Sequence, residues 1–171
     1  SDACLGLVES VGDFYPEAKW QRCTVHFYRN IFSFVPKVKM KDVTIMLKAI
    51  HASEDLTAAQ DKAVSVATKL RGMKLHQAAD ILEKGVAETL CYYDFPSTHW
   101  QRIRTNNPLE RIMREIRRRT NVVGAFPDGN SALMLVAARL RHIAGTKWSS
   151  KRYLNMQLIK ELEVEKQFEV A

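Results

Sequence analysis

Three successive stripes of apolar residues at helical spacing run from Lys37 to about Leu90, and no strand pattern interrupts them. Apolar residues that recur every three or four positions line one face of a helix, so this stretch predicts a block of packed helices. Thr57 with Gln60 fits a helix-capping box, and Gly72 fits a helix end. The stripes are Met40, Val43, Leu47 and Ile50; Ala59, Ala63, Val66, Ala67 and Leu70; and Leu75, Ala79, Leu82, Val86 and Leu90.

One segment before this block favours a strand. Lys19–Val25 is short and rich in residues that are common in strands. A helix is expected before it, with Asp2 beside its start, and another after it, ended by Pro36. Together these elements predict an α/β fold that is mostly α by residue count.

Positive charge is concentrated in one segment. Between Gln101 and Thr120 the chain has seven arginines against two acids, which places +5 of its net charge of +7 there. Arginine makes forked contacts with phosphate, and a local basic patch is typical of a protein that binds nucleic acid. A solvated helix face with internal ion pairs is the alternative. The arginines are Arg102, Arg104, Arg111, Arg114, Arg117, Arg118 and Arg119.

Two acids lie among these arginines. Pro108 fits the first position of a helix. The apolar stripe of this helix begins at Leu109, and Glu110 and Glu115 border that stripe on opposite edges. Periodicity does not choose between them, and an ion pair of Glu110 with Arg114 is the simple interpretation. A carboxylate among cations also suits two-metal phosphoryl transfer, because acids hold Mg²⁺ while cations hold phosphates. Asp2 fits a helix cap, which is the favoured interpretation from the residues alone.

The cysteines favour a reduced, cytoplasmic setting. Three cysteines (Cys4, Cys23 and Cys91) are an odd number without framework spacing. Cys23-x-x-His26 has half of a zinc spacing, but no second pair completes it, so we expect a structural pair. No apolar run approaches the roughly 20 residues that a membrane helix needs, and no membrane partner is expected.

Three segments together carry a resemblance. They are Ser1-Asp2-Ala3-x-x-Gly6-Leu7, Trp20-Gln21-Arg22-Cys23-x-x-His26-Phe27-x-Arg29-Asn30 and Asn106-Asn107-Pro108-Leu109-Glu110-Arg111-Ile112-x-Arg114-Glu115-Ile116-Arg117-Arg118-Arg119-Thr120. In order and spacing they resemble the Mutator-type bacterial insertion-sequence transposases, over most of the chain. Each motif alone is weak, and the middle helical block is only loosely similar.

The resemblance implies a fold and a site. The family has a ribonuclease H-like core with an Asp-Asp-Glu metal site, and a mostly helical insertion precedes the helix that bears the Glu. Asp2 falls on the second catalytic Asp and Glu110 on the Glu, which selects Glu110 over Glu115. Cys23 and His26 fall on the family's C-x-x-H signature, with structural support or DNA positioning as the expected role.

The implied organisation has four parts. Residues 1–36 are expected to be the second part of a ribonuclease H-like core, 37–100 an α-helical insertion, 101–150 core helices and 151–171 a carboxy-terminal tail. The family's first catalytic Asp lies upstream of Ser1, so we expect this chain to be inactive, or nearly so, when alone.

The implied function is metal-dependent cutting and joining of transposon DNA with Mg²⁺ or Mn²⁺ in a two-metal site. The expected partners are double-stranded DNA, both transposon ends and target, and further copies of the complete protein, in the bacterial cytoplasm at the nucleoid. The arginines of residues 111–119 are the first candidates for phosphate contact, followed by Arg102 and Arg104. The alternatives are a non-catalytic nucleic-acid-binding helical module and a structural protein with solvated arginines.

Two aromatic residues before the basic segment leave a further choice open. Trp100 and His99 could stack on an unpaired base. Packing of Trp100 against Tyr92 or Phe95 is the favoured interpretation, because large aromatic side chains are mostly buried.

Overall fold

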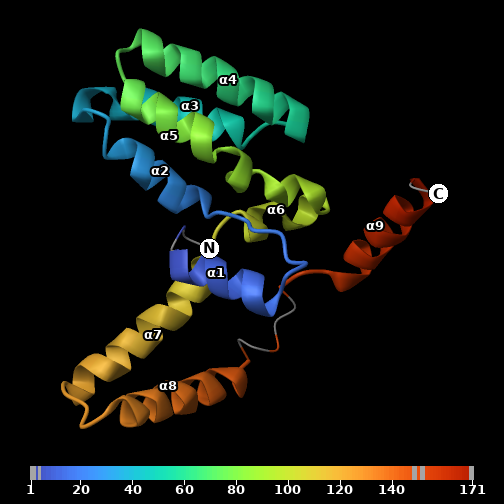
Figure 1. Ribbon diagram of the computed structural model, residues 1–171. Helices are drawn as coiled ribbons and strands as arrows, with labels where there is room; N and C mark the ends of the chain where they lie inside the picture. Colours follow the sequence, from blue (N-terminus) through green and yellow to red (C-terminus); the bar gives the residue numbers. More distant parts are fainter. Residues whose placement is uncertain (1–2, 4, 148–149, 151–152, 170–171) are drawn as a thin grey trace. The chain divides into compact units, whose positions relative to one another are not determined.

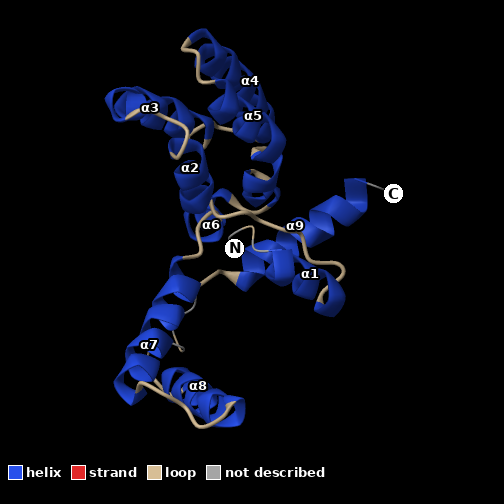
Figure 2. Cartoon of the chain, turned by 60° about the vertical axis from the view of Figure 1, so that its left-hand side comes forward, coloured by secondary structure: helices blue, strands red, loops and turns tan. Residues whose placement is uncertain are grey.

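The computed structural model describes residues 3, 5–147, 150 and 153–169 (Figure 1). Over these residues the chain forms nine α-helices, three short 3₁₀ helices and no strand, so Figure 2 shows only helices joined by loops. In the same part of the chain, no helix combines the length and the apolarity that crossing a bilayer requires.

The helices divide between two units. The larger unit comprises Ser1–Thr105 with Gln157–Ala171, and the smaller unit comprises Asn106–Met156. The larger unit contains α1 (Leu5–Phe14), α2 (Thr24–Phe32), η1 (Lys37–Lys39), α3 (Met40–Ile50), α4 (Leu56–Gly72), α5 (His76–Gly85), η2 (Ala87–Thr89), η3 (Cys91–Asp94), α6 (Ser97–Ile103) and nearly all of α9 (Met156–Glu169). The smaller unit contains α7 (Asn107–Val123) and α8 (Gly129–Ala144).

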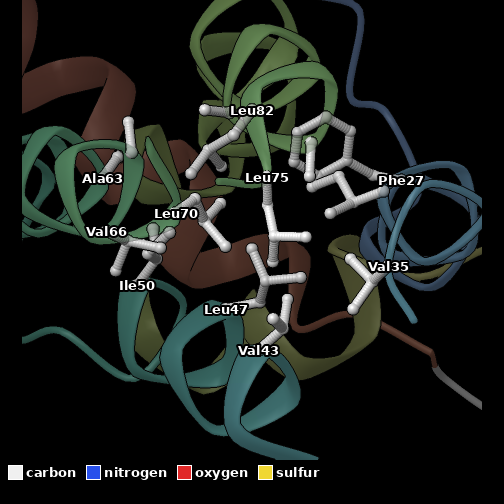
Figure 3. Close-up of a cluster of buried hydrophobic side chains, with 14 of the residues drawn as sticks. Phe27, Val35, Val43, Leu47, Ile50, Ala63, Val66, Leu70, Leu75 and Leu82 are labelled. Carbon is white, nitrogen blue, oxygen red and sulfur yellow. The ribbon is translucent and has the colours of Figure 1, made fainter. Parts of the chain in front are cut away.

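The core of the larger unit lies between α2, α3, α4 and α5. The helix α4 packs against α5 and α3, and α2 packs mainly against α5. Side chains such as Leu47, Leu70 and Leu82 point toward one another there and are fully buried (Figure 3). The predicted helices of this stretch are therefore confirmed, because the buried residues of α3 and α4, with Ala79 and Leu82 of α5, fall on the predicted stripes.

The helix α2 contributes to the same core. Phe27 and Ile31 of α2, with Val35 after it, are spaced four residues apart and are all buried with residues of α3, α4 and α5. The expected division of the chain into parts at residues 36, 100 and 150 stays a prediction.

The start of α4 also differs from the prediction, although its end does not. Asp55 is the N-cap, and its carboxylate accepts a hydrogen bond from the backbone N–H of Ala58 at 2.7 Å. The helix therefore begins one residue before Thr57, which was expected to cap it. It ends at Gly72 as predicted. Asp competes well with Thr as an N-cap, which explains the displacement.

The predicted strand at Lys19–Val25 is wrong. Residues 18–23 form no regular secondary structure, and Thr24 already begins α2. The Arg22 N–H donates to the carbonyl of Glu88 at 2.8 Å, and the Gln21 amide donates to the carbonyl of Thr89 at 3.0 Å. Strand propensity reflects fit to a pleated surface, and no neighbouring strand exists in the part of the chain that the structure describes. The part of the chain that the structure describes is mostly helical and does not support the α/β class, so the ribonuclease H-like core stays a prediction.

Gly85 of α5 lies close to Phe27 of α2 and to Arg22. A Cβ added there would lie 2.7 Å from an Arg22 guanidinium nitrogen and 2.9 Å from the ring of Phe27. The Arg22 guanidinium also lies over that ring, 5.0 Å from its centroid. Because Phe27 is fully buried, its ring has little room to move aside.

We expect Gly85→Ala to lower the free energy of unfolding by about 1–3 kcal/mol, since overpacking a filled core forces side chains out of their preferred positions. Urea unfolding followed by circular dichroism measures the change. Gly72→Ala is the matched control, because no atom lies within 4 Å of the added Cβ there. Equal stabilities of the two variants would contradict the proposed close approach.

Candidate nucleic-acid interface

The arginine-rich segment forms α7, the first helix of the smaller unit. The helix begins at Asn107, so Pro108 is its second residue, one position later than the predicted first helical position. Gly124 ends the helix with a φ of +78°, a left-handed conformation that glycine adopts without strain. Asp128 then caps α8 by accepting the N–H of Ser131 at 2.7 Å. These local signals define two helices joined by a short loop.

The five arginines of α7 are all exposed; they are Arg111, Arg114, Arg117, Arg118 and Arg119. Successive residues turn about 100° around the helix axis, so Arg111, Arg114 and Arg118 share one side. Arg119 lies nearer the apolar stripe. The helix therefore presents the guanidinium groups of these five arginines to solvent. We call the surface that they form the arginine face.

Glu110 lies at the edge of the arginine face. It is partly buried in the first turn of α7, and its N–H donates to the carbonyl of Asn106 at 3.0 Å. Helical geometry places it between Arg114 and Arg117 around the axis. The positive end of the helix dipole also stabilises a negative charge in this turn. The site thus combines an acid with cations, as the sequence predicted.

Glu115 has a different place. Its carboxylate accepts from Arg139 of α8 at 2.7 Å and from Arg118 at 3.1 Å. The hydrogen bond from Arg139, with that from Arg118, holds the pKa of Glu115 below its usual range. Glu115 therefore ties α7 to α8.

The two arginines before α7 differ from each other. Arg102 is exposed on α6. Arg104 is partly buried, and its guanidinium donates to the carbonyl of His51 at 3.1 Å. The carbonyl of Arg104 accepts from the N–H of Thr24 at 3.0 Å and from its hydroxyl at 3.1 Å. Arg104 thus stabilises the larger unit, and its placement lends no support to the predicted phosphate contact.

His51 is the centre of a buried polar cluster in the larger unit. Its Nδ1 lies 2.7 Å from the Tyr28 hydroxyl and its Nε2 lies 2.9 Å from the Thr89 hydroxyl. Burial lowers the pKa of His51 to about 4; the carbonyl of Leu47 opposes this shift, and the charge of Arg104 adds to it. The imidazole is therefore neutral near pH 7.

The Cys23–His26 pair lies at the start of α2. Cys23 is the N-cap residue, its thiol is free, and its side chain is 2 % exposed. His26 is partly buried one turn further on. Among the described residues, no three His, Cys, Asp or Glu side chains gather where they could hold a metal ion. Asp2, the other predicted acid, lies outside the described residues.

The aromatic residues before the basic segment are core residues. The ring of Trp100 packs edge-on against Tyr92 and Tyr93, at centroid distances of 5.7 and 4.6 Å. Its indole N–H donates to the carbonyl of Phe95 at 2.7 Å, and His99 is 2 % exposed. The packing interpretation is confirmed, and neither ring is placed to stack on a base.

Sequence reasoning missed Arg139. It shares the partly buried stripe of α8 with Leu135 and Ile143, and only 17 % of its side chain is exposed. A charged residue on an otherwise apolar stripe indicates a buried ion pair, because an unpaired buried charge is costly. The four-residue spacing of Arg139 from Leu135 and Ile143 is the feature of the sequence that could have predicted this ion pair.

Comparisons with known proteins agree with the predicted family. The family model "Transposase, Mutator family" matches residues 1–150. The chain is 36% identical over 162 residues to the transposase for insertion sequence element IS1081 of Mycobacterium tuberculosis, covering 93% of this chain and 38% of that protein. It is 34% identical to the ISRM5 transposase of Rhizobium meliloti, covering 94% of this chain and 40% of the relative. The IS256 transposase in transposon Tn4001 of Staphylococcus aureus is 32% identical, covering 91% and 40%. The chain thus spans about two fifths of the length of these relatives.

The buried His51 predicts a loss of stability in acid. Its pKa is about 4 in the folded chain against an ordinary 6.5, so folding favours the neutral imidazole. This contribution is complete above pH 6.5 and is lost as the pH falls toward about 4, by roughly 3 kcal/mol in total. Urea unfolding across this pH range, compared between the wild type and His51→Gln, measures it.

The matched control is His76→Gln, at an exposed histidine of α5, whose pH profile is expected to follow that of the wild type. If His51→Gln does not fold, titration of the His51 imidazole by NMR gives its pKa directly. A measured pKa near 6.5 would contradict the role assigned to burial.

Proposed function

Because this chain belongs to the Mutator family of transposases, we propose that it serves metal-dependent DNA cleavage and strand transfer in transposition. The observation that carries the DNA-binding part is the arginine face of α7, which lies within the residues that match the family. The relatives named above are transposases of insertion sequences, which supports a DNA transposase function.

The proposed reaction has two steps. Water hydrolyses a phosphodiester bond at the end of the element, and the freed 3′-hydroxyl then attacks target DNA. A pair of Mg²⁺ or Mn²⁺ ions supplies the activation of the attacking oxygen and stabilises the leaving one. We assign Asp2 and Glu110 as acids that hold them, on the family resemblance.

The described residues account for one of these ligands. Glu110 offers the hard carboxylate oxygens that Mg²⁺ prefers. Asp2 lies outside the described residues, and no cluster of three possible ligands is present among the residues that are described. We therefore derive no step through the metal. The contribution that the geometry supports is binding and placing of DNA by the guanidinium groups around Glu110.

The proposed partners follow from the same assignment. Double-stranded DNA, both as transposon ends and as target, binds to the arginine face. The complete protein acts as a homo-oligomer, and it localises to the bacterial cytoplasm, at the nucleoid. The net charge of +7 favours association with a polyanion.

A second candidate is a helical module that binds nucleic acid without cutting it. The observation in its favour is the lack of a three-ligand cluster among the described side chains. The two functions share the arginine face and differ in their need for metal, so binding and cleavage are tested separately.

DNA binding is expected to weaken steeply with salt. Each phosphate contact contributes about −0.9 to the slope of log affinity against log salt. Arg114→Gln is therefore expected to make the slope shallower by about 0.9, as measured by fluorescence anisotropy of a labelled duplex. The control is Arg29→Gln, which removes an exposed arginine of α2 and should keep the wild-type slope. Equal slopes in all three proteins would contradict the role of the arginine face.

The purified chain is expected to bind DNA without cleaving it. Its two assigned acids are one fewer than the family's three, and a two-metal site with too few ligands holds its ions poorly. Conversion of supercoiled plasmid to nicked circles, with Mg²⁺ or Mn²⁺, is the measurement. Nicking that disappears in Glu110→Gln would sink the expectation, whereas nicking that persists in this variant identifies a contaminating nuclease.

A further inference from the structure

Six cations and no acid occupy two segments that meet at one end of the helical core of the larger unit. The first segment, residues 37–41, forms η1 and begins α3, and the second, residues 69–74, ends α4 and continues into the turn before α5. Lys39 joins them, because its ammonium group donates to the carbonyl of Met73 at 2.8 Å. Figure 1 shows the turn between α4 and α5 at the same end of the core as the start of α3. The cations are Lys37, Lys39, Lys41, Lys69, Arg71 and Lys74.

Most of these cations are not neutralised by an acid. Arg71 is the exception, because it pairs with Asp80 and Glu83 of α5, at 2.7 Å in each case. Four exposed lysines have no ion pair with an acid among the described residues; they are Lys37, Lys41, Lys69 and Lys74. We call these four, together with Lys39, the lysine end. Asp42 follows its first segment directly, so five positive charges there face one adjacent negative charge.

Lys74 occupies a backbone position that favours glycine. Its φ is +62°, and apart from Gly124 no other described residue has a positive φ. Its N–H donates to the carbonyl of Arg71 and the N–H of Leu75 donates to the carbonyl of Leu70, both at 2.9 Å. This pair of hydrogen bonds is the usual way in which a helix ends on a left-handed residue, and that residue is most often glycine because a Cβ is crowded there.

The lysine at this position therefore costs the fold stability. Strained residues of this kind cluster at functional sites, where the side chain has a use that offsets the cost. The Lys74 side chain is exposed and lies in the same turn as the Met73 carbonyl that accepts from Lys39. Its use is thus to add a positive charge to the lysine end.

The chemistry of the lysine end fits a nucleic-acid backbone better than the surface of another protein. The centres of protein–protein interfaces are depleted of lysine and enriched in aromatic residues, and neither segment of the lysine end contains an aromatic residue. An ammonium group on a flexible stem contacts phosphate as a point charge, and phosphate contacts carry no base sequence. The expected ligand is a duplex that is bound without sequence preference.

We propose that the lysine end is a second DNA-binding surface, which contacts backbone phosphates independently of the arginine face. The inference rests on the proposed function and extends it, because it assigns DNA contact to the larger unit as well as to α7. A reaction that joins the ends of an element to target DNA holds more than one duplex segment, so a second surface has a place in it.

The test measures duplex binding by the full chain over a series of salt concentrations, with fluorescence anisotropy of a labelled duplex. Lys74→Gln removes the charge and keeps a side chain at the left-handed position. The expected result is a slope of log affinity against log salt that is shallower by about 0.9, the contribution of one phosphate contact. Lys84→Gln is the matched control, because it makes the same change at an exposed lysine in the last turn of α5, and it should keep the wild-type slope.

Lys74→Gly separates binding from folding. Glycine adopts the φ of +62° without strain, so this variant is expected to unfold at a higher urea concentration than the wild type. Its salt slope is expected to become shallower, as in Lys74→Gln. Circular dichroism follows the unfolding. A rise in stability together with a loss of binding is the result that a merely structural lysine would not give.

The outcomes separate this inference from the proposed function. If Lys74→Gln keeps the wild-type slope while Arg114→Gln makes it shallower, the lysine end is overturned and the proposed function stands. If both changes flatten the slope and their effects add in the double variant, to about 1.8, the two surfaces act independently. Unchanged duplex binding with weaker binding of labelled polyglutamate would assign the lysine end to an acidic protein and overturn the inference. A wild-type chain that binds no duplex would overturn both.

Discussion

Burial of one continuous apolar layer between α2, α3, α4 and α5 is the interaction on which the larger unit depends. Its residues come from stripes that each cover a single helix face, so none of these helices buries its apolar surface alone. Each buried leucine or isoleucine contributes about 1.5–3 kcal/mol relative to exposure. The segment before α2 is held beside this layer by hydrogen bonds to the carbonyls of Glu88 and Thr89, and the lack of a side chain at Gly85 leaves room for Arg22.

A polar cluster then fixes segments that the apolar layer leaves free. His51 joins the end of α3 to Tyr28 of α2 and to Thr89 of η2, while Arg104 returns to the His51 carbonyl from the end of α6. Hydrogen bonds inside a core have strict geometry, so they specify one arrangement where apolar contacts tolerate several. The neutral state of the imidazole is a condition of this arrangement, because its charged form loses the solvation that burial removes.

The sequence predicted the features that depend on the periodicity of apolar residues. It did not predict the features that depend on contacts between residues far apart in the chain. The helical stripes and the end of α4 at Gly72 follow from local rules, and the structure confirms them; Pro108 marks the start of α7 to within one residue. The segment at Lys19–Val25 failed because strand propensity counts only when another strand is present to pair with it. Arg104 and Arg139 are the same residue type as the members of the arginine face. Only the tertiary structure shows that Arg104 donates to the carbonyl of His51 and that Arg139 pairs with the carboxylate of Glu115. The choice of Glu110 over Glu115 came from the resemblance, since both border the same stripe.

The smaller unit has a different kind of stability. None of the residues of α7 and α8, all of which the structure describes, is fully buried, and Leu133 and Met134 are 65% and 73% exposed. Helices held by half-buried side chains and by the ion pair between Glu115 and Arg139 open locally at low free-energy cost. Backbone amides of α7 and α8 should therefore exchange with deuterium well before those of α4 and α5. A helix pair that opens this readily has the freedom to adjust to the curvature of a bound duplex.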